Sequence, residues 1–119
     1  MKSIKELYRI GTGPSSSHTM GPRKAAEMFV ERHPDAASFK VTLYGSLAAT
    51  GKGHMTDVAI IDTLKTTAPV EIIWQPKVFL PFHPNGMTFA AFDANNKIQV
   101  NWTVYSIGGG ALAENNSKI

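Results

Sequence analysis

The sequence predicts a single small α+β domain, in which helices cover one face of a mainly antiparallel sheet. The predicted elements run helix, strand, helix and then several strands, an order typical of α+β folds. The clearest strands form a hairpin, so part of the sheet is expected to be antiparallel. The 119 residues suffice for one core of ordinary size. We place the domain at residues 1–107 and interpret residues 108–119 as a Gly-rich polar tail, a linker or truncation point rather than a packed terminus.

Two helices are predicted from apolar residues with helical spacing. The first carries on one face Ala25, Ala26, Phe29 and Val30. Thr19 is its expected N-cap, which places Pro22 in the first turn, and Pro34 ends the helix. The second helix has Thr56 as its expected N-cap. Its apolar side is formed by Val58, Ile61 and Leu64.

Alternation of apolar and polar residues predicts the strands. Residues 39–44 alternate as in a half-buried strand. Residues 69–84 are β-like, but their prolines restrict them to a sheet edge or an extended loop. Residues 87–104 predict a hairpin that turns at residues 93–96.

The composition excludes several classes of protein. Hydrophobic residues make up 43% and charged residues 18%, as in globular proteins, and the net charge of +3 comes from scattered Lys and Arg without a nucleic-acid-binding stripe. The absence of cysteine excludes disulfides, thiolate catalysis and an iron–sulfur cluster held by this chain. The sequence has no apolar run of the ~18 residues that a membrane span needs, and residues 1–7 carry charges where a secretory signal needs an apolar core. We therefore expect a cytoplasmic protein without nucleic-acid or membrane partners.

The most informative stretch is the loop before the first helix, with Ser15, Ser16 and Ser17 followed by His18 and Thr19. Free N–H groups and the partial positive charge of a helix N-terminus favour an anion there, and the hydroxyls add donors. A carboxylate or phosphate would fit this loop. The alternative is that the serines only cap their own helix. The loop lacks the pattern of a Walker A motif or a dinucleotide fingerprint.

Three of the four histidines lie at Gly- or Pro-rich boundaries between elements: His18, His54 and His83. Functional residues are often located at such boundaries. The fourth, His33, is expected to interact with a helix C-terminus. The histidine spacing matches no compact ligand pattern, so we expect no metal in this chain. The lack of a Gly-x-Ser-x-Gly elbow argues against a serine hydrolase.

Four motifs spread over nearly the whole chain carry a resemblance to a known family. They are residues 10–22, residues 43–54 with Thr56-Asp57, residues 83–87 and residues 105–110. With these motifs in this order, the chain resembles the serine dehydratase beta-chain family, the bacterial L-serine ammonia-lyases that use an iron–sulfur cluster. The resemblance implies a lyase of amino-acid catabolism that converts L-serine to pyruvate and ammonia.

The resemblance also implies a division of labour. In the family, cysteines of an alpha domain hold a 4Fe-4S cluster whose open iron acts as a Lewis acid on the serine hydroxyl. The beta domain packs against the alpha domain and presents residues to the substrate. The resemblance implies that His18 and His54 reach the active site as catalytic residues. The substrate-binding residues would be Ser15, Ser16, Ser17 and Thr19, with His83 and Asn85 lining the pocket. We therefore expect the isolated chain to be inactive.

The family's beta domain is also similar to the allosteric substrate-binding domain of some D-3-phosphoglycerate dehydrogenases. This similarity provides an alternative, a regulatory domain that binds serine or a small anion without chemistry of its own. The histidine-containing motifs favour the dehydratase, because a purely regulatory site has less need of histidines. Apolar docking surface without its partner tends to self-associate, so a homodimer of the isolated domain is a further expectation.

Overall fold

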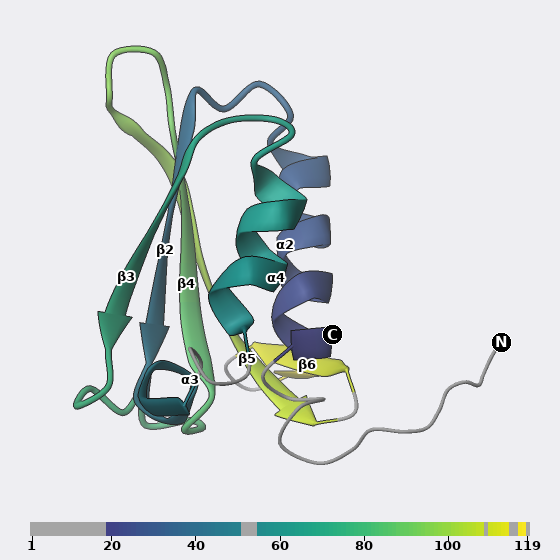
Figure 1. Ribbon diagram of the computed structural model, residues 1–119, viewed down its shortest axis with the longest axis vertical. Coiled ribbons are helices and arrows are strands. Elements are labelled where there is room, and N and C mark those ends of the chain that lie inside the picture. Colours follow the sequence, from purple (N-terminus) through teal and green to yellow (C-terminus); the bar gives the residue numbers. More distant parts are fainter. Residues whose placement is uncertain (1–18, 51–54, 109, 115–116, 119) are drawn as a thin grey trace, which may run out of the picture.

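The computed structural model describes residues 19–50, 55–108, 110–114 and 117–118. Its elements are α2 (Gly21–Arg32), β2 (Ser38–Tyr44), α3 (Gly45–Thr50), α4 (Thr56–Leu64), β3 (Val70–Gln75), β4 (Gly86–Phe92), β5 (Ile98–Gly108), β6 (Ala111–Glu114) and β7 (Ser117–Lys118). The strands form one sheet in the order β3-β2-β4-β5-β6-β7. The β2–β3 pair is parallel and the other pairs are antiparallel. Helices α2 and α4 lie side by side on one face of this sheet (Figure 1), which confirms the predicted α+β architecture.

The core lies between the sheet and these two helices. Alternate residues of β2 point toward the helices and are buried, whereas the residues between them are only half-buried on the other face. Phe29 of α2 lies at the centre of an aromatic cluster, with its ring 6.0 Å from Phe39, 5.4 Å from Phe89 and 6.2 Å from Trp102, measured between centroids. Burial of one such ring contributes about 1.5–3 kcal/mol. This cluster fixes α2 on β2, β4 and β5.

The starts of both helices differ from the prediction. Thr19 and Thr56 were expected to be N-caps, but the N-cap positions are Met20 and Met55, and neither helix has a side-chain cap hydrogen bond. Thr56 is instead the first residue of α4 and is completely buried, so tertiary packing outweighs its local capping preference. The expected place of Pro22 in the first turn of α2 is confirmed.

The predicted hairpin is confirmed, with Met87 opposite Val104 and Phe89 opposite Trp102. Its turn is held by the Asp93 carboxylate, which accepts hydrogen bonds from the backbone N–H of Asn95 and of Lys97. Residues 69–84 also behave as predicted, because β3 occupies a sheet edge and the residues after Gln75 leave the sheet.

The tail after residue 107 requires a correction. Residues 111–114 were expected to be unpacked, but they form strand β6 beside β5. Leu112 and Ala113 are almost completely buried, and the indole N–H of Trp102 donates a hydrogen bond to the carboxylate of Glu114. Strand β6 has only four residues and follows the glycines at 108–110, which favoured a linker in the sequence although β6 pairs with the adjacent β5. The boundary at residue 107 and a linker role of the tail stay predictions.

Candidate functional site

The family motifs that the structure describes meet at one end of the sheet. This site end is formed by the last residues of β2 and β5, the first residues of β4 and the turn at residues 83–85 that precedes β4. The N-termini of α2 and α4 lie at the same end (Figure 1). The topology explains this arrangement, because each of these helices runs antiparallel to the strand that follows it.

Hydrogen bonds tie the turn at residues 83–85 to both neighbouring strands. The Asn85 side-chain amide donates to the carbonyl oxygen of Ser106 at 3.2 Å, and the Ser106 N–H donates to the Asn85 carbonyl at 3.0 Å. On the other side, the Ser46 N–H donates to the Pro84 carbonyl at 3.1 Å. The turn is therefore fixed between β5 and the start of α3.

The same turn determines which ring nitrogen of neutral His83 carries the proton. The backbone N–H of Asn85 donates to Nδ1 of His83 at 3.0 Å. Because Nδ1 accepts this hydrogen bond, the neutral ring carries its proton on Nε2. The half-buried His83 thus offers an N–H donor from a fixed ring.

Two glycines allow close approach at the site end. A Cβ atom at Gly21 would lie 2.0 Å from Oγ of Ser106, so only glycine lets the N-terminus of α2 come this near to β5. Gly45 has a φ of +51° and begins α3 directly after β2. A Cβ there would meet the Pro84 carbonyl oxygen at 2.7 Å and the Phe79 ring at 2.8 Å.

Tyr105 fills the sheet face opposite to the helices at this end. It is 2% exposed, and its ring centroid lies 4.8 Å from that of Phe82. Burial raises the pKa of the Tyr105 phenol, and the negative charge that Tyr44 acquires on ionisation raises it further. Tyr105 is therefore a neutral packing residue that supports the turn and does not act as a base near neutral pH.

The predicted site residues fall into two groups. The catalytic candidates His18 and His54 and the three serines at positions 15–17 lie outside the described residues. Thr19 is half-buried just before α2, whose first residue contacts Ser106. His83 and Asn85 lie in the same turn, so the structure brings these two predicted residues together with Ser106.

Ser46 and Ser106 are hydrogen-bonded to the turn at residues 83–85, and sequence reasoning named neither of them as a candidate site residue. The available signal was their position inside the second and fourth family motifs, at residues 43–54 and 105–110. Their backbone groups, rather than a recognisable side-chain pattern, connect them to the turn at residues 83–85. Backbone hydrogen bonds of this kind leave no composition signal in the sequence.

The part of the chain that the structure describes contains no group of three or more His, Cys, Asp or Glu residues that could hold a metal ion. The whole chain has no cysteine, so its residues do not fit a thiolate-held cluster. None of the described helices is long and apolar enough to cross a membrane.

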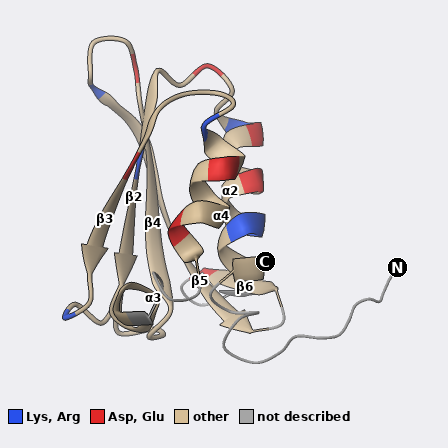
Figure 2. Ribbon diagram, in the orientation of Figure 1, with Lys and Arg blue, Asp and Glu red and all other residues tan. Residues whose placement is uncertain are grey.

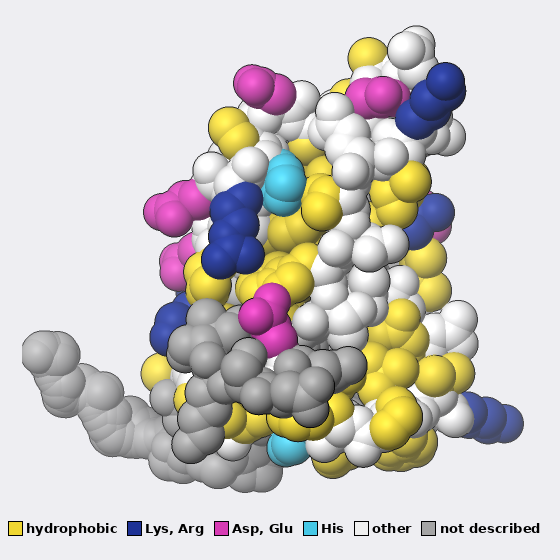
Figure 3. All heavy atoms as spheres, turned by 180° about the vertical axis from the view of Figure 1, so that it is seen from behind, with side chains coloured by type: hydrophobic (Ala, Val, Ile, Leu, Met, Phe, Trp, Pro, Cys, Tyr) yellow, Lys and Arg dark blue, Asp and Glu magenta, His cyan; other side chains and the backbone are white. Residues whose placement is uncertain are grey.

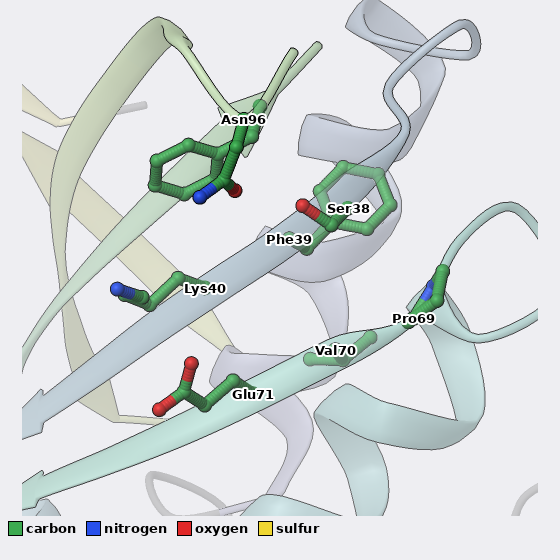
Figure 4. A pocket seen from close by; sticks show the side chains of 8 residues that line it. Ser38, Phe39, Lys40, Pro69, Val70, Glu71 and Asn96 are labelled. Atoms are coloured by element: carbon green, nitrogen blue, oxygen red, sulfur yellow. The ribbon is translucent and has the colours of Figure 1, made fainter. Parts of the chain in front are cut away.

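A hollow of about 330 Å³ lies away from the site end (Figure 4). Lys40 on β2 and Glu71 on β3 are register partners at this hollow, and the Lys40 ammonium lies 5.5 Å from the Phe92 ring centroid. The hollow shares no residue with the four motifs, and it lies near the hairpin turn at the other end of β4. The hollow is therefore separate from the site end.

Comparison with known proteins defines the class of this domain. The family model described as serine dehydratase beta chain matches residues 3–75 and 62–117. The L-serine dehydratase of Streptomyces coelicolor is 34% identical over 94% of the chain and 33% of its own length. Those of Haemophilus influenzae, at 33% identity, and of Escherichia coli K12 (L-serine dehydratase TdcG), at 34% identity, each match 96% of the chain and 34% of their own lengths. The chain belongs to the serine dehydratase beta chain family and spans about a third of the length of these relatives.

The relatives also contain residues that this chain lacks. The alignment with the Streptomyces coelicolor relative extends over 152 residues, although the chain has only 119. The two ranges matched by the family model overlap at residues 62–75. This overlap indicates that the extra residues of the relatives lie in the region from the end of α4 to β3. In this chain, α4 and β3 are connected by residues 65–69 alone.

Proposed function

We propose that this chain is the beta part of an L-serine dehydratase, which converts L-serine to pyruvate and ammonia together with a larger alpha part. The family membership and the names of the relatives support the activity. The relatives' greater length supports a larger partner, because about two thirds of their residues have no counterpart here. The observation that carries the proposal is the convergence of Gly21, Ser46, Asn85 and Ser106, which come from all four motifs, at one end of the sheet.

The proposed site suits the carboxylate of serine. The N-terminus of α2 lies at the site end and presents N–H groups and a partial positive charge, with no acidic residue in its first turn. The N-terminus of α4 lies at the same end, but its first turn carries Asp57. We assign Ser15, Ser16, Ser17 and Thr19 to hydrogen bonding with this carboxylate, because hydroxyl donors are suited to bind it. We add His83, through Nε2–H, and Asn85 to the pocket lining, because both lie in the turn at the site end.

The elimination removes the α-proton and the hydroxyl group of serine, so it requires proton transfer at two positions. We assign His18 and His54 to these transfers, because imidazole is the side chain best suited to general acid–base chemistry near neutral pH. The 4Fe-4S cluster is proposed for the alpha part, since this chain has no cysteine to hold it. There it would supply a Lewis acid for the serine hydroxyl. A cytoplasmic location and a homodimer stay predictions from the sequence.

The test uses three histidine variants of the complex. The chain is co-expressed anaerobically with its alpha part, and pyruvate formation from L-serine is measured for His18→Ala, His54→Ala and His33→Ala. His33 is the matched control, because it caps the far end of α2 and its ring lies 4.7 Å from that of Phe29. General acid–base catalysis contributes about 10²–10⁴-fold, so the first two variants should lose at least about 100-fold in kcat. His33→Ala should retain the wild-type rate, and equal rates for all three would contradict the assignment.

A further inference from the structure

Exposed hydrophobic side chains gather on one short segment beside the site. Seven large hydrophobic side chains in the described part of the chain are exposed, and three of them lie within residues 78–82. Val78 is 42%, Phe79 60% and Phe82 44% exposed. Figure 3 shows hydrophobic side chains gathered at the lower end of this face of the molecule. Single exposed hydrophobic residues need no explanation, whereas a cluster of them marks an interaction surface. We call Val78, Phe79 and Phe82 the apolar ridge.

The apolar ridge is held in place by its surroundings. The Val78 N–H donates to the Gln75 carbonyl at 3.2 Å, and Phe82 packs on Tyr105. Leu80 lies between them and close to Gly86. A Cβ atom added at Gly86 would be 2.8 Å from Cδ1 of Leu80. Pro76, Pro81 and Pro84 further restrict the backbone of this segment. Two phenyl rings held outward on a fixed backbone lose little conformational entropy on binding, so the ridge is pre-organised for a partner.

The segment that carries the ridge is uncharged apart from Lys77, which directly precedes Val78. No Asp, Glu, Lys or Arg occurs between Lys77 and Asp93, and the acidic residues that Figure 2 shows lie on other segments, among them α2, α4 and β3. This composition fits a permanent, apolar interface and does not fit an anionic partner such as a nucleic acid. The turn at residues 83–85 follows Phe82 directly, so a partner on the ridge would also close over the proposed serine site.

We infer that the apolar ridge is the surface on which the alpha part of the dehydratase docks. The inference rests on the proposed function. The occupant is chosen because the relatives continue for about two thirds of their length beyond the region matched here, and a part of that size needs an interface. Contacts between parts of one enzyme are more apolar than transient ones, which agrees with the ridge. Docking at residues 78–82 places the alpha part next to His83 and Asn85, so both parts reach one substrate.

The experiment measures the affinity of the alpha part for this chain with substitutions on the ridge. The alpha part encoded with this chain is purified anaerobically and immobilised, and Kd is determined for the wild-type chain, Phe79→Ser, Val78→Ser and Ile98→Ser. Ile98 is a matched control, because it is 54% exposed and lies at the start of β5, at the far end of the sheet. Removal of a central aromatic anchor should raise Kd at least tenfold, whereas Ile98→Ser should stay within twofold of wild type.

A second readout requires no substitution. Backbone hydrogen exchange of residues 76–85 in the wild-type chain should slow when the alpha part is added. It therefore decides the question if Phe79→Ser fails to fold, which circular dichroism would reveal. If the wild-type chain binds the alpha part and the folded ridge variants bind with the same Kd, the inference is overturned. It is also overturned if the alpha part binds but residues 76–85 are not protected from exchange. Either result leaves the proposed function intact. A wild-type chain that neither binds nor activates the alpha part would overturn the proposed function as well.

Discussion

A methyl group added at Gly21 should push α2 away from β5 at the site end. The Cβ atom of Gly21→Ala would lie 2.0 Å from Oγ and 2.8 Å from Cβ of Ser106. Rotation of the hydroxyl relieves the first contact but not the second, because the Cβ position is fixed by the strand. Ser106 is completely buried, so open space to accommodate a shift is lacking around this side chain. The helix N-terminus must therefore move.

The expected cost follows from two opposing effects. Overpacking of a buried site costs about 1–3 kcal/mol. Replacing glycine by alanine recovers up to about 1 kcal/mol through helix propensity and the entropy of the unfolded chain. These two ranges allow a net loss of about 0–3 kcal/mol in the free energy of unfolding, and their midpoints give about 1.5 kcal/mol. For a chain of this size, the midpoint corresponds to a fall in Tm of about 4–9 °C.

Urea denaturation of four proteins tests this reasoning: wild type, Gly21→Ala, Ser106→Gly and the double variant. Ser106→Gly removes both clashing atoms, so the double variant should be more stable than the sum of the single effects predicts, by at least about 1 kcal/mol. The pyruvate-forming activity of the complex should fall with Gly21→Ala and recover in the double variant. A fully stable Gly21→Ala, or additive losses in the double variant, would refute the contact.

Three further predictions concern the packing that supports the site. Glu114→Ala leaves the indole N–H of Trp102 without its acceptor and should lower the free energy of unfolding by about 1.5–3 kcal/mol in urea; no loss would show that β6 is not part of the packed domain. The raised pKa of Tyr105 means that the folded state holds this proton more tightly than the unfolded state, so its stabilising contribution is present below about pH 10 and is lost as pH rises through the folded pKa. The free energy of unfolding should therefore fall above about pH 10, and Tyr105→Phe should reduce this fall. If wild type and variant lose stability equally as the pH rises, the prediction is wrong. Phe89→Ala opens a cavity under the aromatic cluster and should cost about 3–5 kcal/mol in thermal unfolding, whereas a loss below about 1 kcal/mol would contradict the central place of the cluster.

Local patterns in the sequence predicted the elements that show a clear alternation or helical spacing of their own. The hairpin of β4 and β5 follows from alternation on both sides of one turn, and β2 follows from the alternation of Phe39, Val41 and Leu43. The parallel pairing of β2 with β3 was not predicted, because it joins strands separated by two helices. Strand β6 was missed for a different reason: it pairs with the adjacent β5, but it has only four residues and the glycines before it were interpreted as part of a linker.

The candidate site was predictable only where a motif itself forms the local structure. The turn at residues 83–85 was named from its own sequence, and its internal hydrogen bond from Asn85 to His83 is local. The contacts with Ser46 and Ser106 depend on sheet order, which no single motif encodes. The predicted start of α4 was wrong because burial of Thr56 outweighed its capping preference. Local sequence patterns thus identified candidate site residues, whereas the sheet order determines which of them come into contact.

The central claim is that this chain completes an L-serine dehydratase. The most direct test is to measure pyruvate formation from L-serine by the anaerobically purified alpha part, with and without this chain. The account predicts that activity requires both parts and saturates at a one-to-one ratio. An alpha part that turns over serine equally well without the chain would contradict the account and would favour a separate serine- or anion-binding regulatory domain.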